Sequence, residues 1–325
     1  MVRFFRMVSS LLAVFNAFLE ENPLLRISHQ FHFSKDTSTS LLLAVGAAMG
    51  FGMKAIFIKL AFPYGVSPVT LLALRMIFAA PFFLWVGLRS AGKPLDRYTL
   101  LGVIGCGLAG YYGASIFDFI GLQYISAGLE RLILFTYPTL TVVAGALLQK
   151  KPLTGRILKS LALTYGGIGL AFAHDVQSFG DVEQVWIGGG FVFASAICFA
   201  TYLLGSGALI EKLGSNRFTA WAMLVSSIAT FVHYGATEPL DILLHQPWPV
   251  YGWAFAMAIF STVLPVLMQS AAIRRMGAGK AAIIGTVGPL LTIFLGWWIL
   301  GEPGSVWQLV GAGLVLAGVW QIGKK

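Results

Sequence analysis

The chain has 325 residues, of which 57% are hydrophobic and 11% are charged, and its mean hydropathy is +0.80. Because charged residues make up about a quarter of an ordinary soluble domain, this composition excludes the soluble class and predicts a polytopic membrane protein. The net charge of +9 does not indicate nucleic-acid binding, since the basic residues stand in small groups between apolar segments. Cys106 and Cys198 both lie inside apolar segments, so neither a disulfide framework nor a metal site is supported.

Residues 1–37 differ from the rest of the chain. Arg3 and Arg6 precede an apolar run over 7–19, which is too short to cross a bilayer and has no small-residue cleavage pattern after it. We predict that residues 1–37 form a cytoplasmic or interfacial extension. The alternative is that the start of the protein is assigned too far upstream, and a signal peptide is disfavoured.

From Ser38 onward, apolar segments follow one another with short breaks, and each is long enough to cross about 30 Å of hydrocarbon as a helix. The short breaks require neighbouring helices to pack as antiparallel hairpins. The fold class expected is therefore an all-α integral membrane protein. Its ten predicted spans are 39–61, 68–89, 98–121, 125–148, 156–173, 185–210, 217–236, 249–272, 279–300 and 306–322.

Charges between the spans predict the orientation. The even-numbered breaks contain the basic residues Arg89, Lys93, Arg97, Lys150, Lys151, Arg156, Lys159, Lys212, Arg217, Arg274, Arg275 and Lys280. The odd-numbered breaks contain instead His174, Asp175, Asp181, Glu183, Glu238, Asp241 and Glu302. Because cytoplasmic loops carry the excess of Lys and Arg, we expect a multi-pass protein of the cell inner membrane with both termini in the cytoplasm.

An internal repeat divides the chain into two halves. At an offset of 151 residues, the recurring positions are Ala127, Gly128, Pro138, Leu140, Thr141, Gly145 and Pro152, matched by Ala278, Gly279, Pro289, Leu291, Thr292, Gly296 and Pro303. Five spans in each half is an odd number, so the second copy must enter the membrane from the opposite side. The predicted domains are residues 1–37 as the extension, 38–174 as the first repeat and 185–323 as the second, inverted repeat.

These features resemble the drug/metabolite transporter superfamily in its EamA type. The sequence Leu300-Gly301-Glu302-Pro303 looks like the usual end of the fourth helix of a repeat in that family. Arg75 looks like the arginine that recurs in the second helix of a repeat in that family. The first copy departs from the pattern, with Gln149-Lys150-Lys151-Pro152. The resemblance implies a secondary carrier that moves small organic molecules, often outward, through a central cavity lined by helices 1, 3, 4, 6, 8 and 9.

Ionisable residues inside spans are costly, which makes them functional candidates. They are Lys54, Lys59, Arg75, Asp118, Glu130 and Arg131. We expect Lys59, Asp118, Glu130 and Arg131 to lie at similar depth as an ion-pair cluster, which could be a static tie, an outer gate or a protonatable coupling site. Lys54 lies deeper in its span, and two roles for it stay open. It could pair with Asp118 or a backbone carbonyl, or it could contact an anionic substrate. For Arg75 we favour a structural role.

Other candidates are polar groups on the helices that the resemblance places around the cavity. Tyr111, Tyr112, Tyr137, Tyr202 and Gln269 would leave unsatisfied polar atoms if they faced hydrocarbon, so they are expected to line the pathway. Pro138 and Pro289 lie at matched positions within spans and are expected to act as kinks or hinges.

The leading interpretation is a secondary active transporter that exports amino-acid-like or amphiphilic metabolites by alternating access. An importer of a vitamin, nucleoside or metabolic precursor is the alternative. An enzyme is disfavoured, because neither a phosphate-binding GxxxxGK[ST] motif nor an in-span catalytic set occurs. The expected partners are a small-molecule substrate and the lipid bilayer, with protons as coupling ion and a homodimer as options; no nucleic acid, cofactor or metal is expected.

Overall fold

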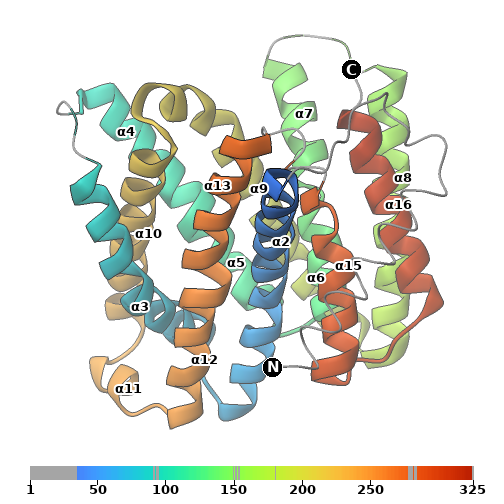
Figure 1. Cartoon of the computed structure of the whole chain (residues 1–325). Helices are drawn as coiled ribbons and strands as arrows, with labels where there is room; N and C mark the ends of the chain where they lie inside the picture. Colours follow the sequence, from blue (N-terminus) through green and yellow to red (C-terminus); the bar gives the residue numbers. More distant parts are fainter. Residues whose placement is uncertain are drawn as a thin grey trace. The chain divides into compact units, whose positions relative to one another are not determined.

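The computed structural model describes residues 35–90, 92, 95–148, 150, 152, 154–179, 181–276, 281 and 284–323. The chain divides into the units Met1–Thr39 and Ser40–Lys325, and the second unit contains nearly all of the described residues. Nearly all of the predicted N-terminal extension lies outside the described residues. Within the described residues every regular element is helical and none is a strand (Figure 1).

The first half of the chain forms a series of helices that run across the unit and back. Its elements are α2 (Lys35–Ala61), η2 (Phe62–Tyr64), α3 (Pro68–Arg89), α4 (Arg97–Cys106), η3 (Gly107–Gly113), α5 (Ala114–Gly121), α6 (Ala127–Leu134), α7 (Tyr137–Leu148) and α8 (Gly155–Phe179). Several begin at side-chain caps: Ser67 accepts from the Thr70 N–H, Asp96 from the Thr99 N–H and Ser126 from the Leu129 N–H.

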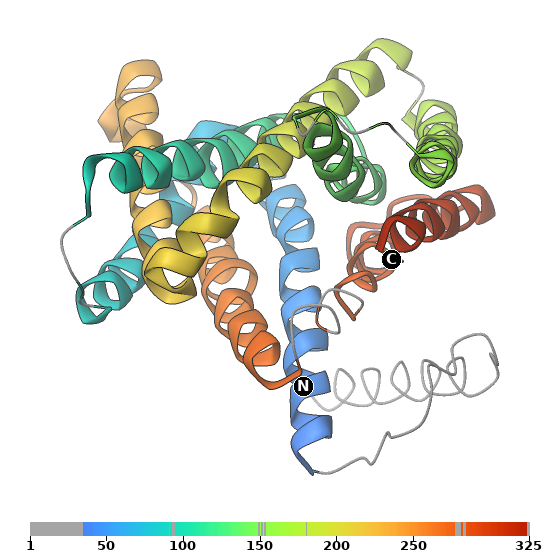
Figure 2. The same ribbon diagram turned by 90° about the horizontal axis from the view of Figure 1, so that it is seen from above.

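The second half continues in the same way. Its described elements are α9 (Val182–Leu213), α10 (Ser215–Thr237), α11 (Leu240–Leu244), α12 (Trp248–Ala258), η4 (Ile259–Val263), α13 (Leu264–Met276), α15 (Gly288–Leu295), η5 (Gly296–Leu300) and α16 (Val306–Gly323). From above, α9 runs beside α4 and α5 and reaches α7 (Figure 2). α9 thus packs against α4, α5 and α7 of the first half.

In the part of the chain that the structure describes, length and composition identify six helical segments that could cross a membrane. They are Thr39–Tyr64, Pro68–Arg89, Arg97–Gly121, Ala127–Leu148, Val182–Leu213 and Trp248–Ile273. Gly288–Leu300 and Val306–Gln321 are shorter apolar helices. A multi-pass membrane protein is therefore confirmed, while the number of ten spans stays a prediction.

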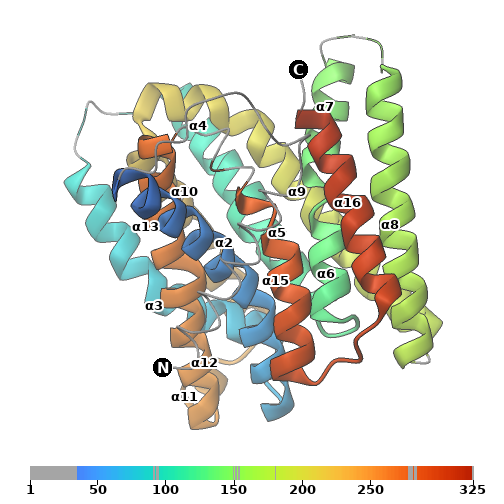
Figure 3. The same cartoon turned by 45° about the vertical axis from the view of Figure 1, so that its right-hand side comes forward.

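Helices that correspond to each other in the two halves pack together. α3 packs against α10 and α8 against α16, while α6 packs against α15, which is the repeat counterpart of α7; Figure 3 shows the pairs α6–α15 and α8–α16 side by side. The contact of α8 with α16 is very close at two glycines. A Cβ atom on Gly311 would lie 2.5 Å from the carbonyl oxygen of Gly167, and a Cβ atom on Gly167 would lie 2.4 Å from that of Gly311. Small residues here allow two backbones to touch.

A short interruption of the helix precedes each of the two matched prolines. α6 ends at Leu134 and α7 begins at Tyr137, so Pro138 lies in the first turn of a new helix. Pro289 likewise lies in the first turn of α15, after the turn residue Val287. An interruption at this place is compatible with the kink expected from the missing proline N–H, so a role of the two prolines as hinges stays a prediction.

Both halves also contain a π-helical segment at a matched position. These are η3 at Gly107–Gly113 and η4 at Ile259–Val263. Adding the repeat offset of 151 to 107–113 gives 258–264, which contains η4. π-Helical turns inside α-helices are rare and frequently lie at functional sites. Their recurrence therefore makes the third and eighth predicted spans candidates for a functional site.

Candidate functional site

Four charged side chains that are distant in sequence meet inside the unit. The Lys54 Nζ atom of α2 lies 2.7 Å from Asp118 Oδ2 of α5 and 3.8 Å from Glu130 Oε1 of α6. Arg131 Nε lies 3.7 Å from Glu130 Oε2. The side chains of Asp118 and Glu130 are fully buried and that of Lys54 is 18% exposed. We call Lys54, Asp118, Glu130 and Arg131 the charged cluster.

Arg131 connects α6 to the backbone of α2. Its Nη2 atom donates to the carbonyl oxygen of Phe51 at 2.7 Å and approaches that of Gly52 at 3.5 Å. Thr292 of α15 also donates to the Gly52 carbonyl, at 3.2 Å. Lys54 is the cation within 4 Å of both Asp118 and Glu130, whereas Arg131 lies near Glu130 and also donates to the carbonyl oxygens of α2.

Arg75 lies beside this cluster and has separate partners. Its Nη2 atom donates to Ser115 Oγ at 2.9 Å, and its guanidinium lies 5.1 Å from the ring centre of Phe119. A hydrogen bond and a cation–π contact of this kind hold α3 against α5. The favoured structural role of Arg75 thus has a physical basis in these two contacts.

The structure changes which lysine belongs to the cluster. Lys54, and not Lys59, contacts Asp118, whereas Lys59 lies within electrostatic range of Glu302 and Asp175. The expected grouping of Lys59 with Asp118, Glu130 and Arg131 is therefore corrected. Of the two alternatives for Lys54, the pairing with Asp118 is the one present here.

A second group of polar contacts caps the N-terminus of α6, one turn before Glu130. Asp175 of α8 accepts from the Ser126 N–H and from Ser126 Oγ, both at 2.9 Å. Glu302, in the connection from η5 to α16, accepts from the Ala127 N–H at 2.9 Å. Carboxylates are favourable at this end of a helix because its free N–H groups carry partial positive charge. We call Ser126, Ala127, Asp175 and Glu302 the α6 cap.

Sequence reasoning missed the α6 cap, because it used Asp175 only as a marker of orientation and Glu302 only as such a marker and as part of the family motif. That motif, with Gly301-Glu302-Pro303, was the available signal for Glu302. Gly301 adopts φ 66°, in the left-handed region, and so turns the chain back toward α6. A Cβ atom on Gly296 would lie 2.6 Å from Glu302 Oε2, so that glycine leaves room for the carboxylate. Burial raises the pKa of Glu302, opposed by the Ala127 N–H and by Lys59.

The four tyrosine candidates form two separate groups, one with Tyr111, Tyr137 and Tyr202 and the other with Tyr112. Tyr111 and Tyr202 hydrogen bond through their hydroxyls at 3.0 Å, and their ring centres lie 5.1 Å apart. Phe199 stacks on Tyr202 at 5.4 Å and meets Tyr137 at 4.8 Å, which extends the aromatic row to the α6–α7 break. This row therefore connects η3, α9 and α7.

The remaining polar candidates are not part of the aromatic row. Tyr112 shares a hydrogen bond of 3.0 Å with His233 Nδ1 of α10 instead. Gln269 is half-buried in α13. It stands 151 residues after Asp118, and so at the repeat position equivalent to that carboxylate.

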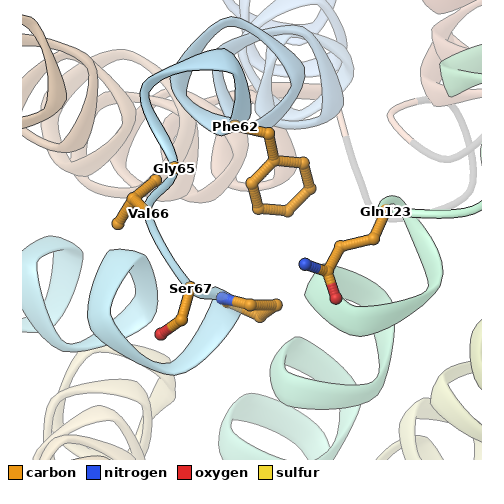
Figure 4. A pocket seen from close by; sticks show the side chains of 6 residues that line it. Phe62, Gly65, Val66, Ser67 and Gln123 are labelled. Atoms are coloured by element: carbon orange, nitrogen blue, oxygen red, sulfur yellow. The ribbon is translucent and has the colours of Figure 1, made fainter.

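A shallow pocket of about 420 Å³ opens beside the α2–α3 connection (Figure 4). Its lining consists of Phe62, Gly65, Val66, Ser67, Pro68 and Gln123. Phe62 and Gln123 approach each other across the opening. This pocket contains none of the charged candidates. Among the described residues, no group of three or more His, Cys, Asp or Glu side chains could hold a metal ion.

Comparisons with known proteins place the fold. The EamA-like transporter family model matches residues 38–173 and 186–323. The uncharacterized transporter YcbK of Bacillus subtilis is 28% identical over 297 residues, which cover 89% of this chain and 94% of that protein. An S-adenosylmethionine/S-adenosylhomocysteine transporter of Chlamydia trachomatis is 23% identical over 264 residues, 78% of this chain and 79% of that protein.

A solved crystal structure is similar with a TM-score of 0.60 at 17% identity, covering 87% of this chain and 94% of that one. At this identity the likeness shows the fold alone. The family model, in contrast, matches most of the chain, once in each half. The chain belongs to the EamA-like transporter family and is a membrane transporter.

Proposed function

We propose that this protein is a secondary active transporter that exports small organic metabolites by alternating access. The observation that carries the proposal is the buried charged cluster, which joins α2, α5 and α6 inside a transporter fold. Buried ionisable groups inside a membrane protein are costly and usually mark the pathway of a substrate or a proton. Structural ties alone could be made at lower cost by apolar packing.

The cluster suits proton coupling because two carboxylates share one ammonium group. A proton bound by Glu130 would leave Lys54 paired with Asp118 at 2.7 Å. A proton bound by Asp118 would leave Lys54 to Glu130. Each protonation state therefore keeps Lys54 in an ion pair, and when Glu130 is protonated Arg131 still has the Phe51 carbonyl as a hydrogen-bond acceptor, so a proton can enter and leave while both cations keep a partner.

The halves 38–174 and 185–323 are proposed as inverted repeats of five helices each around a central cavity, with both termini cytoplasmic. Three observations support this arrangement: corresponding helices pack together, both halves have a helix break before a matched proline, and both have a matched π-helical segment. Pairs of broken helices at corresponding positions typically surround the binding site in transporters of this architecture.

The substrate proposed is an amino-acid-like or amphiphilic metabolite. Carboxylates and cations in the charged cluster offer partners to both charges of a zwitterion, and the aromatic row of Tyr111, Tyr202, Phe199 and Tyr137 offers an apolar surface. One relative is named as a carrier of S-adenosylmethionine, which is such a compound. An importer of a vitamin, nucleoside or precursor is the alternative, and a homodimer is compatible with either.

Cysteine labelling tests the inverted topology. In a chain with Cys106 and Cys198 replaced by serine, Thr154→Cys and Val306→Cys each introduce one exposed thiol beside a matched loop. A membrane-impermeant maleimide added to intact cells is expected to label Val306→Cys only, because basic residues hold the loop before α8 in the cytoplasm. Labelling of both thiols from the same side would contradict the inverted repeats.

Flux measurements test export and coupling together. Cells that overexpress the protein are compared with cells that lack it, and a metabolite that falls inside the first and rises in their medium is then loaded into liposomes with purified protein. With one proton exchanged per substrate, an inward gradient of one pH unit is expected to drive efflux up to an outside-to-inside concentration ratio of about ten, since it supplies about 1.4 kcal/mol. Efflux that ignores the gradient would exclude proton coupling, and gradient-driven uptake in the opposite direction would favour the importer.

A further inference from the structure

The α6 cap connects three parts of the chain that are far apart in sequence. Asp175 comes from α8 in the first half, whereas Glu302 comes from the connection between η5 and α16 in the second half. His174 Nε2 also lies 2.9 Å from the carbonyl oxygen of Pro303, beside Glu302. The two halves are therefore joined by polar contacts at this end of the helices.

Local geometry directs Glu302 to α6. The left-handed turn at Gly301 ends η5, and the Glu302 N–H donates back to the Gly296 carbonyl at 3.1 Å. Gly128 lies so close to α16 that a Cβ atom there would approach Gln308 Nε2 to 2.4 Å. Glycines at 296, 301 and 128 thus allow the connection to lie directly on the first turn of α6, where the Ala127 N–H meets Glu302.

The α6 cap is mechanically coupled to the charged cluster because both lie on one short helix. Ala127 and Glu130 are three residues apart in α6, so one helical turn separates the Glu302 contact from the Lys54 contact. A movement of the first turn of α6 must therefore displace Glu130 and Arg131. Such a displacement would change the distances that keep Lys54 between its two carboxylates.

We propose that Glu302 is a positioning residue. Its carboxylate holds the second half of the chain against the first turn of α6, and this contact keeps Glu130 close to Lys54. We call the contact the latch, and it breaks when the two halves separate at this end of the helices. The role in a transport cycle rests on the proposed function, whereas the latch itself rests on the hydrogen bond between Glu302 and Ala127. Charge-assisted hydrogen bonds to backbone N–H groups are strong enough to hold such a closed state.

A distance measurement tests the latch in the full-length protein in lipid nanodiscs. Spin labels at Gln123→Cys and Val306→Cys, in the background without Cys106 and Cys198, flank the α6 cap from both halves. The closed state gives one short distance. Glu302→Ala is expected to shift the closed-to-open ratio about tenfold toward longer distances, because it removes one charge-assisted hydrogen bond.

Asp181→Ala is the matched control. Asp181 also caps a helix, because it accepts from the Gln184 N–H of α9 at 3.1 Å, but this hydrogen bond stays within one helix and joins no second element. Its distance distribution is expected to equal that of the wild type. An unchanged distribution in folded Glu302→Ala would overturn the latch. If that variant is not recovered folded, Glu302→Gln keeps an acceptor oxygen without charge, and we expect an intermediate shift; no shift would again overturn it.

The same experiment separates the latch from the proposed function. If the label distance responds to Glu302 in a protein that moves no metabolite, the proposed function fails and the latch stands. If purified protein transports in liposomes while the distance ignores Glu302→Ala, the latch fails and transport stands. A transport assay of Glu302→Ala adds a further check, since an opened latch is expected to lower turnover more than apparent substrate affinity.

Discussion

Replacing Lys54 with methionine is expected to lower the free energy of unfolding by about 3–5 kcal/mol and to abolish transport. The variant leaves Asp118 and Glu130 buried without the ammonium that they share, and removing one partner of a buried ion pair costs this much. Thermal unfolding of the purified protein and flux in liposomes measure the two effects. Lys54→Arg, which keeps the charge, is expected to retain most of the stability.

The double variant Lys54→Met, Asp118→Asn separates stability from function. It removes one positive and one negative charge together, so we expect most of the stability to return because Glu130 keeps Arg131 at 3.7 Å. Transport should not return, since the shared ammonium is the element that exchanges carboxylate partners. A stable double variant with wild-type flux would show that the charged cluster is only a structural tie.

The second large effect concerns the contact of α8 with α16. Gly311→Ala is expected to lower the free energy of unfolding by about 1–3 kcal/mol, since the added Cβ atom would lie 2.5 Å from the Gly167 carbonyl oxygen and must push two backbones apart. Gly313→Ala is the matched control, because no atom outside its own helix lies within 4 Å of its added Cβ. Thermal unfolding in detergent compares the two variants, and equal losses would contradict a specific backbone contact.

Hydropathy located the ends of some helices, because crossing hydrocarbon imposes a minimum length and few charges on each segment. The described helices α3 (Pro68–Arg89) and α7 (Tyr137–Leu148) end where the spans 68–89 and 125–148 were expected to end. The exact place of the interruption before Pro138, at Phe135 and Thr136, was not predicted. A proline in an apolar run is compatible with both a kink and a new first turn, and only the neighbouring helices decide between them.

Depth estimates could not identify the lysine of the charged cluster. Lys54 and Lys59 are five residues apart, which is about 7.5 Å along a helix. A long lysine side chain or a modest tilt covers that distance. The direction around α2 decides instead, and it depends on how α5 and α6 pack against it. Similarly, adjacent Tyr111 and Tyr112 contact α9 and α10 respectively, within a π-helical segment that no sequence pattern indicated.

The left-handed turn at Gly301 has a counterpart at Lys150, its repeat position, which adopts φ 53° although it is not a glycine. That conformation costs a residue with a Cβ atom about 1–2 kcal/mol. The first half therefore retains the turn while its side chain has become a cation. If the halves are inverted as proposed, the backbone of this position gives both copies the same bend, and its side-chain charge differs between the copy on the cytoplasmic side and the copy on the outer side.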